Sequence, residues 1–117
     1  MLENIALIKE VHEHLATKDA QVQAREALAK INLQKISLYR VHMCNAYEIF
    51  CVCVVRAMMS DDKSVIIISP INLLDNSSSM DDVVSVIKKL QMSQDIVILD
   101  TLANETHYKE VSCNIVK

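Results

Sequence analysis

Glycine is absent from this chain of 117 residues. At the average usage of about 7%, roughly eight glycines would be expected in a chain of this length. Glycine adopts positive φ at little cost and lets a backbone approach a phosphate closely. Its absence excludes the GxxxxGK[ST] phosphate loop, the GxGxxG dinucleotide turn and the GxSxG nucleophile elbow. We therefore expect no self-sufficient nucleotide-using enzyme, and we expect turns built from Asn, Asp and Ser.

Other scarcities narrow the class of protein further. There is one proline and no tryptophan, and aromatic residues make up 3% of the chain, which predicts a core of Ile, Val, Leu, Met and Cys. The net charge of -3 supplies no overall basic field, so broad electrostatic binding of nucleic acid is not expected. The apolar runs are too short to span a bilayer, and the N-terminus has no basic region typical of a secretory signal.

The length and the hydrophobic fraction of 51% predict one domain with one core over residues 1–117. Three of the four cysteines lie in an apolar run, which indicates buried thiols in a reducing compartment. We therefore expect a cytoplasmic or nuclear protein that contacts no membrane.

The hydrophobic periodicity predicts helices and strands that alternate along the chain. Leu2–Leu15 has near-helical spacing, although Ile5–Ile8 also fits a short opening strand. The other expected helices are Asp19–Ile31, residues 45–59 and residues 79–92, and the expected strands are Lys35–Met43, Ser64–Ser69, Asp95–Leu102 and Val111–Val116. This order predicts an α/β (α+β) fold, a single domain with a mixed central sheet of about four strands and helices packed on it.

Residues at the helix ends sharpen these boundaries. Asn45 suits the cap of the third helix, and Ser79 with Asp82 matches a capping box at the fourth. Asp75–Ser79 is the clearest loop, and Ile71–Leu74 reads as a short apolar edge piece.

Residue types that bind zinc occur in two places. His12 lies two residues from His14, and Cys51 lies two residues from Cys53. On a helix such pairs point about 200° apart, so neither pair chelates one ion without help. We therefore favour core thiols and solvated histidines, and we expect no metal and no cofactor.

Few residues of the sequence are arranged in a way that could support catalysis. Cys113 with His107 could form a nucleophile pair, but the sequence offers no oxyanion loop to accompany it. The adjacent carboxylates Asp61 and Asp62 fit a turn, and Asp81 and Asp82 fit a helix N-terminus. The chain is therefore expected not to be an enzyme.

The segment from Tyr39 to Tyr47 combines hydrogen-bonding and aromatic side chains at an expected strand-to-helix junction. A helix N-terminus there could hold a phosphate, and the aromatic rings could stack a base; the alternative is an ordinary loop with one buried tyrosine. The helix that follows is apolar on most of its circumference, so we expect it to be buried or presented to a partner.

Several strings of the chain, taken in order, are similar to one family. The matching pieces are Ile5–Thr17, Ile36–Met58 (ISLYRVHMCNAYEIFCVCVVRAM), Ser69–Met92 (SPINLLDNSSSMDDVVSVIKKLQM) and Asp95–Leu102. Together they resemble the small kinase-binding subunit of the KEOPS (EKC) complex, whose animal member is the PRPK-binding protein. The chain departs from the family at Ala46, Ile49 and Gln91, where the family has serine, histidine and glycine. The resemblance therefore implies strain or a different turn at Gln91, and it implies a short form without the family's usual C-terminal helix.

The resemblance implies a non-catalytic accessory subunit. It would bind the small atypical protein kinase of the complex and other subunits. It would also help hold the 3′ end of a tRNA while a partner enzyme installs threonylcarbamoyl on an adenosine. The kinase-binding residues would be Ile49, Phe50, Val52, Val55 and Met58, and the tRNA-binding residues Arg40, His42, Asn45 and Tyr47.

Two other classes of protein remain open on the sequence. One is a small viral or parasite effector that binds a host protein through the same apolar helix. The other is a small enzyme with a cysteine nucleophile. Self-association through the apolar helix also remains open.

Overall fold

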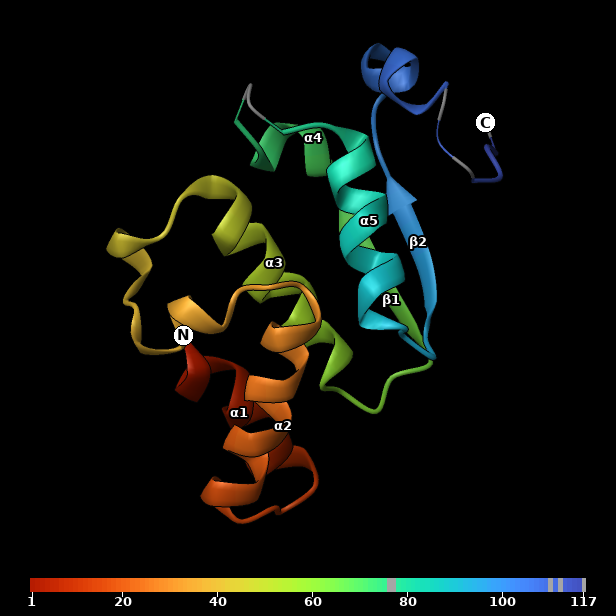
Figure 1. The fold of residues 1–117 in the computed structure, drawn as a ribbon. Coiled ribbons are helices and arrows are strands. Elements are labelled where there is room, and N and C mark those ends of the chain that lie inside the picture. Colours follow the sequence, from red (N-terminus) through yellow and green to blue (C-terminus); the bar gives the residue numbers. More distant parts are fainter. Residues whose placement is uncertain (76–77, 110, 112, 117) are drawn as a thin grey trace.

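A computed structural model describes residues 1–75, 78–109, 111 and 113–116 (Figure 1). Its helices and strands are α1 (Leu2–His12), α2 (Thr17–Lys30), η1 (Gln34–Leu38), η2 (Val41–Met43), α3 (Ala46–Met58), β1 (Ser64–Ile68), α4 (Pro70–Leu73), α5 (Met80–Leu90), β2 (Asp95–Leu99) and η3 (Leu102–Tyr108). The chain is thus mostly helical, with a helical part from α1 to α3 followed by a part that contains both strands.

The helical part is built around an α1–α2 hairpin that packs beside α3 (Figure 1). The buried side of α2 carries the small residues Ala20, Ala24 and Ala27. Small side chains let α1 approach closely, and Ile5 and Ala6 of that helix have no exposed area. Residues 5–8 therefore belong to a helix, and the alternative of an opening strand is wrong.

Helices α3 and α5 begin where the sequence predicts. The Asn45 side chain accepts the Glu48 N–H at 2.8 Å, and the Glu48 carboxylate accepts the Asn45 N–H at 3.0 Å. Ser79 and Asp82 form the same capping box at the start of α5. Each box satisfies main-chain donors that a helix leaves unpaired at its first turn.

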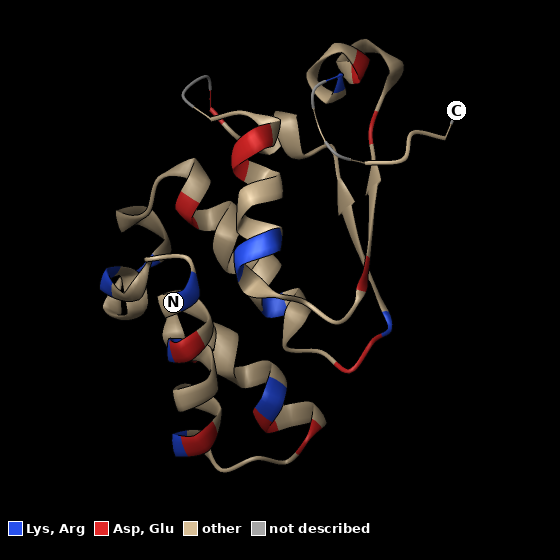
Figure 2. Ribbon diagram, turned by 45° about the vertical axis from the view of Figure 1, so that its right-hand side comes forward, with Lys and Arg blue, Asp and Glu red and all other residues tan. Residues whose placement is uncertain are grey.

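The sheet contains two strands, and the prediction of a mixed sheet of about four strands is wrong. β1 and β2 pair in parallel, in a register that runs from Ser64 opposite Asp95 to Ile68 opposite Leu99. α5 forms the crossover between them, as parallel strands require. In both views the helices lie to one side of this sheet (Figures 1 and 2).

The expected strand over Lys35–Met43 is instead a pair of short 3₁₀ helices, η1 and η2. The core-facing residues there repeat every three positions, since Leu33 and Ile36 are buried and Tyr39 packs against the core. The N-terminal ammonium of Met1 also donates to the Tyr39 carbonyl at 2.6 Å. A period of three suits a 3₁₀ helix, whereas a strand needs a period of two, so Leu38 points into solvent.

Two other expectations concern short segments. Ile71–Leu74 was expected as an edge piece but falls mostly in the single-turn helix α4, because Pro70 has the fixed φ that suits a first helical position. The expected strand Val111–Val116 includes Ser112, which lies outside the described residues, and the described residues around it are not in a strand. The expected loop Asp75–Ser79 contains residues 76–77, which also lie outside the described part.

Four described residues take positive φ without being glycine: His14, Asn32, Ser69 and Gln91. Gln91, at φ 51°, ends α5 in the left-handed conformation. This agrees with the expectation of strain at that position, because a Cβ makes this conformation costly. Asn32 and Ser69 are among the residue types expected to replace glycine in turns.

Candidate protein-binding surface

One face of the β1–β2 sheet is uncovered. Ile66 and Ile68 of β1 expose 60% and 65% of their surface, and Val97 and Leu99 of β2 expose 44% and 52%. The register places Ile66 beside Val97 and Ile68 beside Leu99. These four aliphatic side chains therefore form one contiguous patch, which we call the open face.

The opposite face of the same strands is covered. Val65 and Ile67 are buried, and Ile96 and Ile98 pack against the core. Strand residues alternate between the two faces, so a run of consecutive aliphatic residues in each strand makes both faces apolar. Parallel sheets normally carry helices on both faces. Here the helices cover only one, which makes the open face unusual.

Charges lie at the ends of the strands (Figure 2), and Asp95, which shares the exposed side of β2 with Val97 and Leu99, borders the open face. β2 begins at Asp95 and is followed by Asp100, whereas Ser64–Ile68 of β1 carries no charged residue. Clusters of exposed aliphatic side chains without charge are typical of protein-binding surfaces. The open face is therefore the first candidate for a functional surface.

The outer edge of β1 lies beside a groove. Asp95 N–H donates to the Lys63 carbonyl at 2.9 Å, and Ser69 N–H donates to the Leu99 carbonyl at 2.7 Å. Main-chain groups along a strand point alternately to its two sides. Hence the N–H and C=O groups of Ser64, Ile66 and Ile68 point away from β2, towards the outer edge.

A cavity of about 340 Å³ lies along this edge, and we call it the β1 groove. Its apolar lining includes Ile8 of α1 and Ala57 of α3, together with Val65 and Ile66 of β1. Its ionisable lining consists of His12, Arg56 and Asp62. Arg56 is exposed, and its side chain makes no hydrogen bond or ion pair with any residue that the structure describes.

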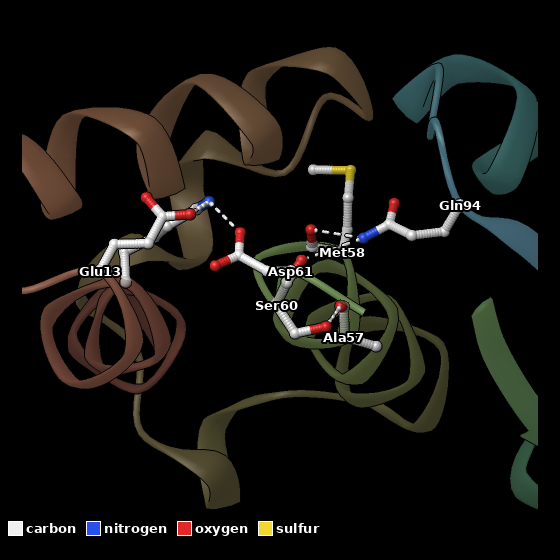
Figure 3. A network of polar contacts seen from close by, with 7 residues as sticks. Glu13, Ala57, Met58, Ser60, Asp61 and Gln94 are labelled. Carbon is white, nitrogen blue, oxygen red and sulfur yellow. Dashed lines mark hydrogen bonds and ion pairs between the residues drawn. The ribbon is translucent and has the colours of Figure 1, made fainter. Parts of the chain in front are cut away.

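Side-chain contacts hold the strand starts against the end of α3, as Figure 3 shows. The Gln94 amide donates to the Met58 carbonyl at 2.9 Å and to the Ser60 carbonyl at 3.2 Å. The Ser60 hydroxyl donates to the Ala57 carbonyl at 2.8 Å. The bonds to Met58 and Ala57 engage carbonyls of the last turn of α3, which lack partners further along the helix, and the bond to Ser60 holds the residue that follows the helix.

A second contact joins α1 to the loop before β1. Lys9 of α1 lies 3.9 Å from the Asp61 carboxylate and also pairs with Glu13. The hydrogen bond from Lys9 lowers the pKa of Glu13, whereas the neighbouring Glu13 carboxylate raises the pKa of Asp61. The walls of the β1 groove are therefore tied together by polar contacts on two sides.

The residues expected to bind a kinase lie on α3, mainly inside the chain. Phe50, Val52 and Val55 are buried in the core, and Ile49 and Met58 are partly buried. The apolar circumference of α3 is thus used largely by contacts within the chain. In the strand-containing part, the pairing register places the four exposed aliphatic side chains of the open face side by side, whereas Leu73 and Leu102 are exposed outside the strands.

The residues expected to bind tRNA lie in the segment from η2 to the first turn of α3. Arg40 and His42 are exposed, while the Asn45 side chain is engaged by the Glu48 N–H. The Glu48 carboxylate itself occupies the helix N-terminus, which leaves less positive potential there for a phosphate. Burial, with a contribution from Cys51, raises the pKa of Tyr47 to about 12.

The cysteines and histidines are not gathered into a site. Cys51 is buried and Cys53 is exposed, as two positions about 200° apart on α3 require. Burial raises the pKa of Cys51 to about 11, so this side chain is a protonated thiol at neutral pH. Within the described residues, no group of three or more His, Cys, Asp or Glu side chains is placed to hold a metal ion.

No protein-family model matches the chain, and no curated protein matches it either. Among the described residues, no helix has the length and apolar character needed to cross a bilayer. The open face was not among the residues that the sequence singled out. Its signal is present in the two strands, because consecutive aliphatic residues predict two apolar faces, and the expected helices do not specify which face they cover.

Proposed function

We propose that this protein is a non-catalytic subunit that binds another protein through the open face. The observation that supports the proposal is the contiguous patch of Ile66, Ile68, Val97 and Leu99, exposed on one face of a parallel sheet. Covering such a patch removes apolar surface from water, at about 25 cal/mol per Å². A partner that supplies a complementary apolar surface therefore gains binding energy there.

The specific form of the proposal is a kinase-binding accessory subunit of a KEOPS-type complex. It rests on the resemblance of Ile36–Met58 and Ser69–Met92 to that family. In this form the partner is a small atypical protein kinase, the complex modifies tRNA, and the protein works in the cytoplasm or nucleus. The exposed Arg40 and His42 are then the residues available to contact tRNA.

Co-purification tests both the general proposal of a protein-binding subunit and its specific KEOPS form. The tagged chain is purified from its own cells, and its partners are identified by mass spectrometry. We expect an atypical kinase among them, and we expect loss of the gene to reduce threonylcarbamoyladenosine in tRNA. A kinase-free preparation with unchanged tRNA modification would remove the KEOPS form and favour an effector that binds a different protein.

A matched pair of substitutions tests the surface. Val97→Lys places a charge on the open face, whereas Val22→Lys places one on α2, where Val22 is exposed by 43% compared with 44% for Val97. We expect Val97→Lys to abolish capture of the partner and Val22→Lys to retain it. Equal capture by both variants would show that the open face is not the binding surface.

A further inference from the structure

The outer edge of β1 offers main-chain groups as well as side chains. Ile66 and Ile68 present their side chains on the open face and their N–H and C=O groups at the outer edge. With Ser64 they form a row of main-chain groups without a partner in the described part of the chain. Such a row is a template for another strand.

The two edges of the sheet differ in charge. β2 is bounded by Asp95 and Asp100, and carboxylates at the ends of an edge strand repel a further strand that carries acidic residues. β1 has no charge, proline or bulge within Ser64–Ile68, although Lys63 precedes the strand and Pro70 follows it by two residues. An added strand is therefore favoured at β1.

We infer that the partner covers this region with an extended segment that pairs with β1 and lies in the β1 groove, an inference that rests on the proposed function. In a paired strand alternate side chains point to opposite faces. Those on the inner face would contact Ile8 and Ala57, and those on the outer face would extend the open face beside Ile66. The segment is accordingly aliphatic at successive positions.

The groove also selects for charge. The Arg56 guanidinium lines it, together with the His12 imidazole and the Asp62 carboxylate. A guanidinium without a partner binds a carboxylate in two parallel hydrogen bonds. The segment is therefore expected to carry an acidic side chain where it passes Arg56.

A synthetic peptide tests this inference on the full chain. The probe is an octapeptide with Val and Ile at the six successive inner positions and Glu at both ends, and its control has Lys in place of Glu. Binding is followed by amide hydrogen exchange in nuclear magnetic resonance spectra. We expect the probe to slow exchange at Ser64, Ile66 and Ile68 by about tenfold or more, because these amides gain acceptors, and to leave Val65 and Ile67 little changed.

Two variants check the two parts of the inference. Ile66→Pro removes an outward N–H and leaves the bonds to β2 intact, so it is expected to abolish binding of the probe. Arg56→Glu is expected to weaken the Glu probe about tenfold and to favour the Lys control, whereas Arg25→Glu on α2 changes neither. If Ile66→Pro does not fold, the charge reversal at Arg56 still decides the question.

The outcomes separate this inference from the proposed function. Absence of slowed exchange at the three outward amides, at any soluble probe concentration, would overturn strand addition. If Val97→Lys still abolishes capture of the natural partner in that case, the open face remains the binding surface. If Val97→Lys also has no effect, both proposals fail.

Discussion

In the helical part of the molecule, Ile5, Ala24 and Val55 have no exposed area, whereas in the strand-containing part Ile66 and Ile68 are mostly exposed. Both groups are aliphatic, so residue type does not explain the difference. The helices α1, α2 and α3 pack against one another, so each covers the apolar side of its neighbours. The two strands are covered by helices on one face only, because the described part of the chain supplies no element for the other.

This comparison separates folding from binding. A side chain buried in the native state contributes to the stability of the chain, whereas one left in solvent contributes little and remains available to a partner. The buried side chains of both parts therefore carry stability, and the open face carries the proposed function. The predictions below test that division.

The largest expected effect contrasts two isoleucines. Ile5→Ala removes a fully buried side chain and is expected to lower the free energy of unfolding by about 2–5 kcal/mol. Ile66→Ala removes an exposed side chain and is expected to change it by only about 0.5 kcal/mol. Urea unfolding followed by circular dichroism measures both, and similar losses for the two variants would contradict the division.

The capping box of α3 provides the next effect. Glu48→Ala removes the carboxylate that accepts the Asn45 N–H and leaves that donor without its side-chain partner. We expect a loss of about 1–2 kcal/mol in the free energy of unfolding. Glu26→Ala, at an exposed position in α2, serves as the control and is expected to have little effect. Equal unfolding midpoints for these variants would show that the box adds nothing.

A gain in stability is expected at the end of α5. Gln91→Gly removes the Cβ that makes φ 51° costly, which stabilises the folded state. Glycine also makes the unfolded chain more flexible, which offsets part of this stabilisation. The net gain is expected to be about 0.5–1 kcal/mol. Asn32→Gly, at φ 57°, should gain less because Asn tolerates this conformation better. Thermal unfolding compares the two, and destabilisation by Gln91→Gly would be the contrary result.

The smallest effect is local and depends on pH. Burial alone would raise the pKa of Asp100, but hydrogen bonds from Tyr108 and Asn104 outweigh burial, so the pKa is lowered. A carboxyl with a lowered folded-state pKa stabilises the structure above its unfolded pKa, near 3.9, and this contribution is lost as the pH falls through the folded value. We expect the contacts of η3 to loosen in that acidic range before the helical part unfolds.

Chemical shifts of Tyr108 followed from neutral to acidic pH check this prediction. The Asp100→Asn variant lacks the titrating group, so its Tyr108 shifts are expected to stay constant over the same range. A wild-type transition that coincides with global unfolding would contradict a separate local step.

Helix starts were the most predictable part of the fold, because Asn45 and Ser79 act through residues three positions away. β1 and β2 were also predicted, since their aliphatic runs are short and bounded by polar residues. The segment around Ile36 was mistaken for a strand because its alternating residues also fit a repeat of three. The repeat that is adopted depends on contacts with core residues that are distant in the sequence.

The proposed binding surface was likewise not predictable from local sequence patterns. The sequence by itself indicates two aliphatic strands, and its lack of glycine excludes a glycine-rich nucleotide loop. It does not say that α3 turns most of its apolar side chains inward, nor that one face of the sheet stays open. Local composition determines which segments become helices or strands, because caps and periodicity act over a few residues. Only the tertiary structure decided which aliphatic side chains are buried, because burial depends on how many elements are present to cover each face.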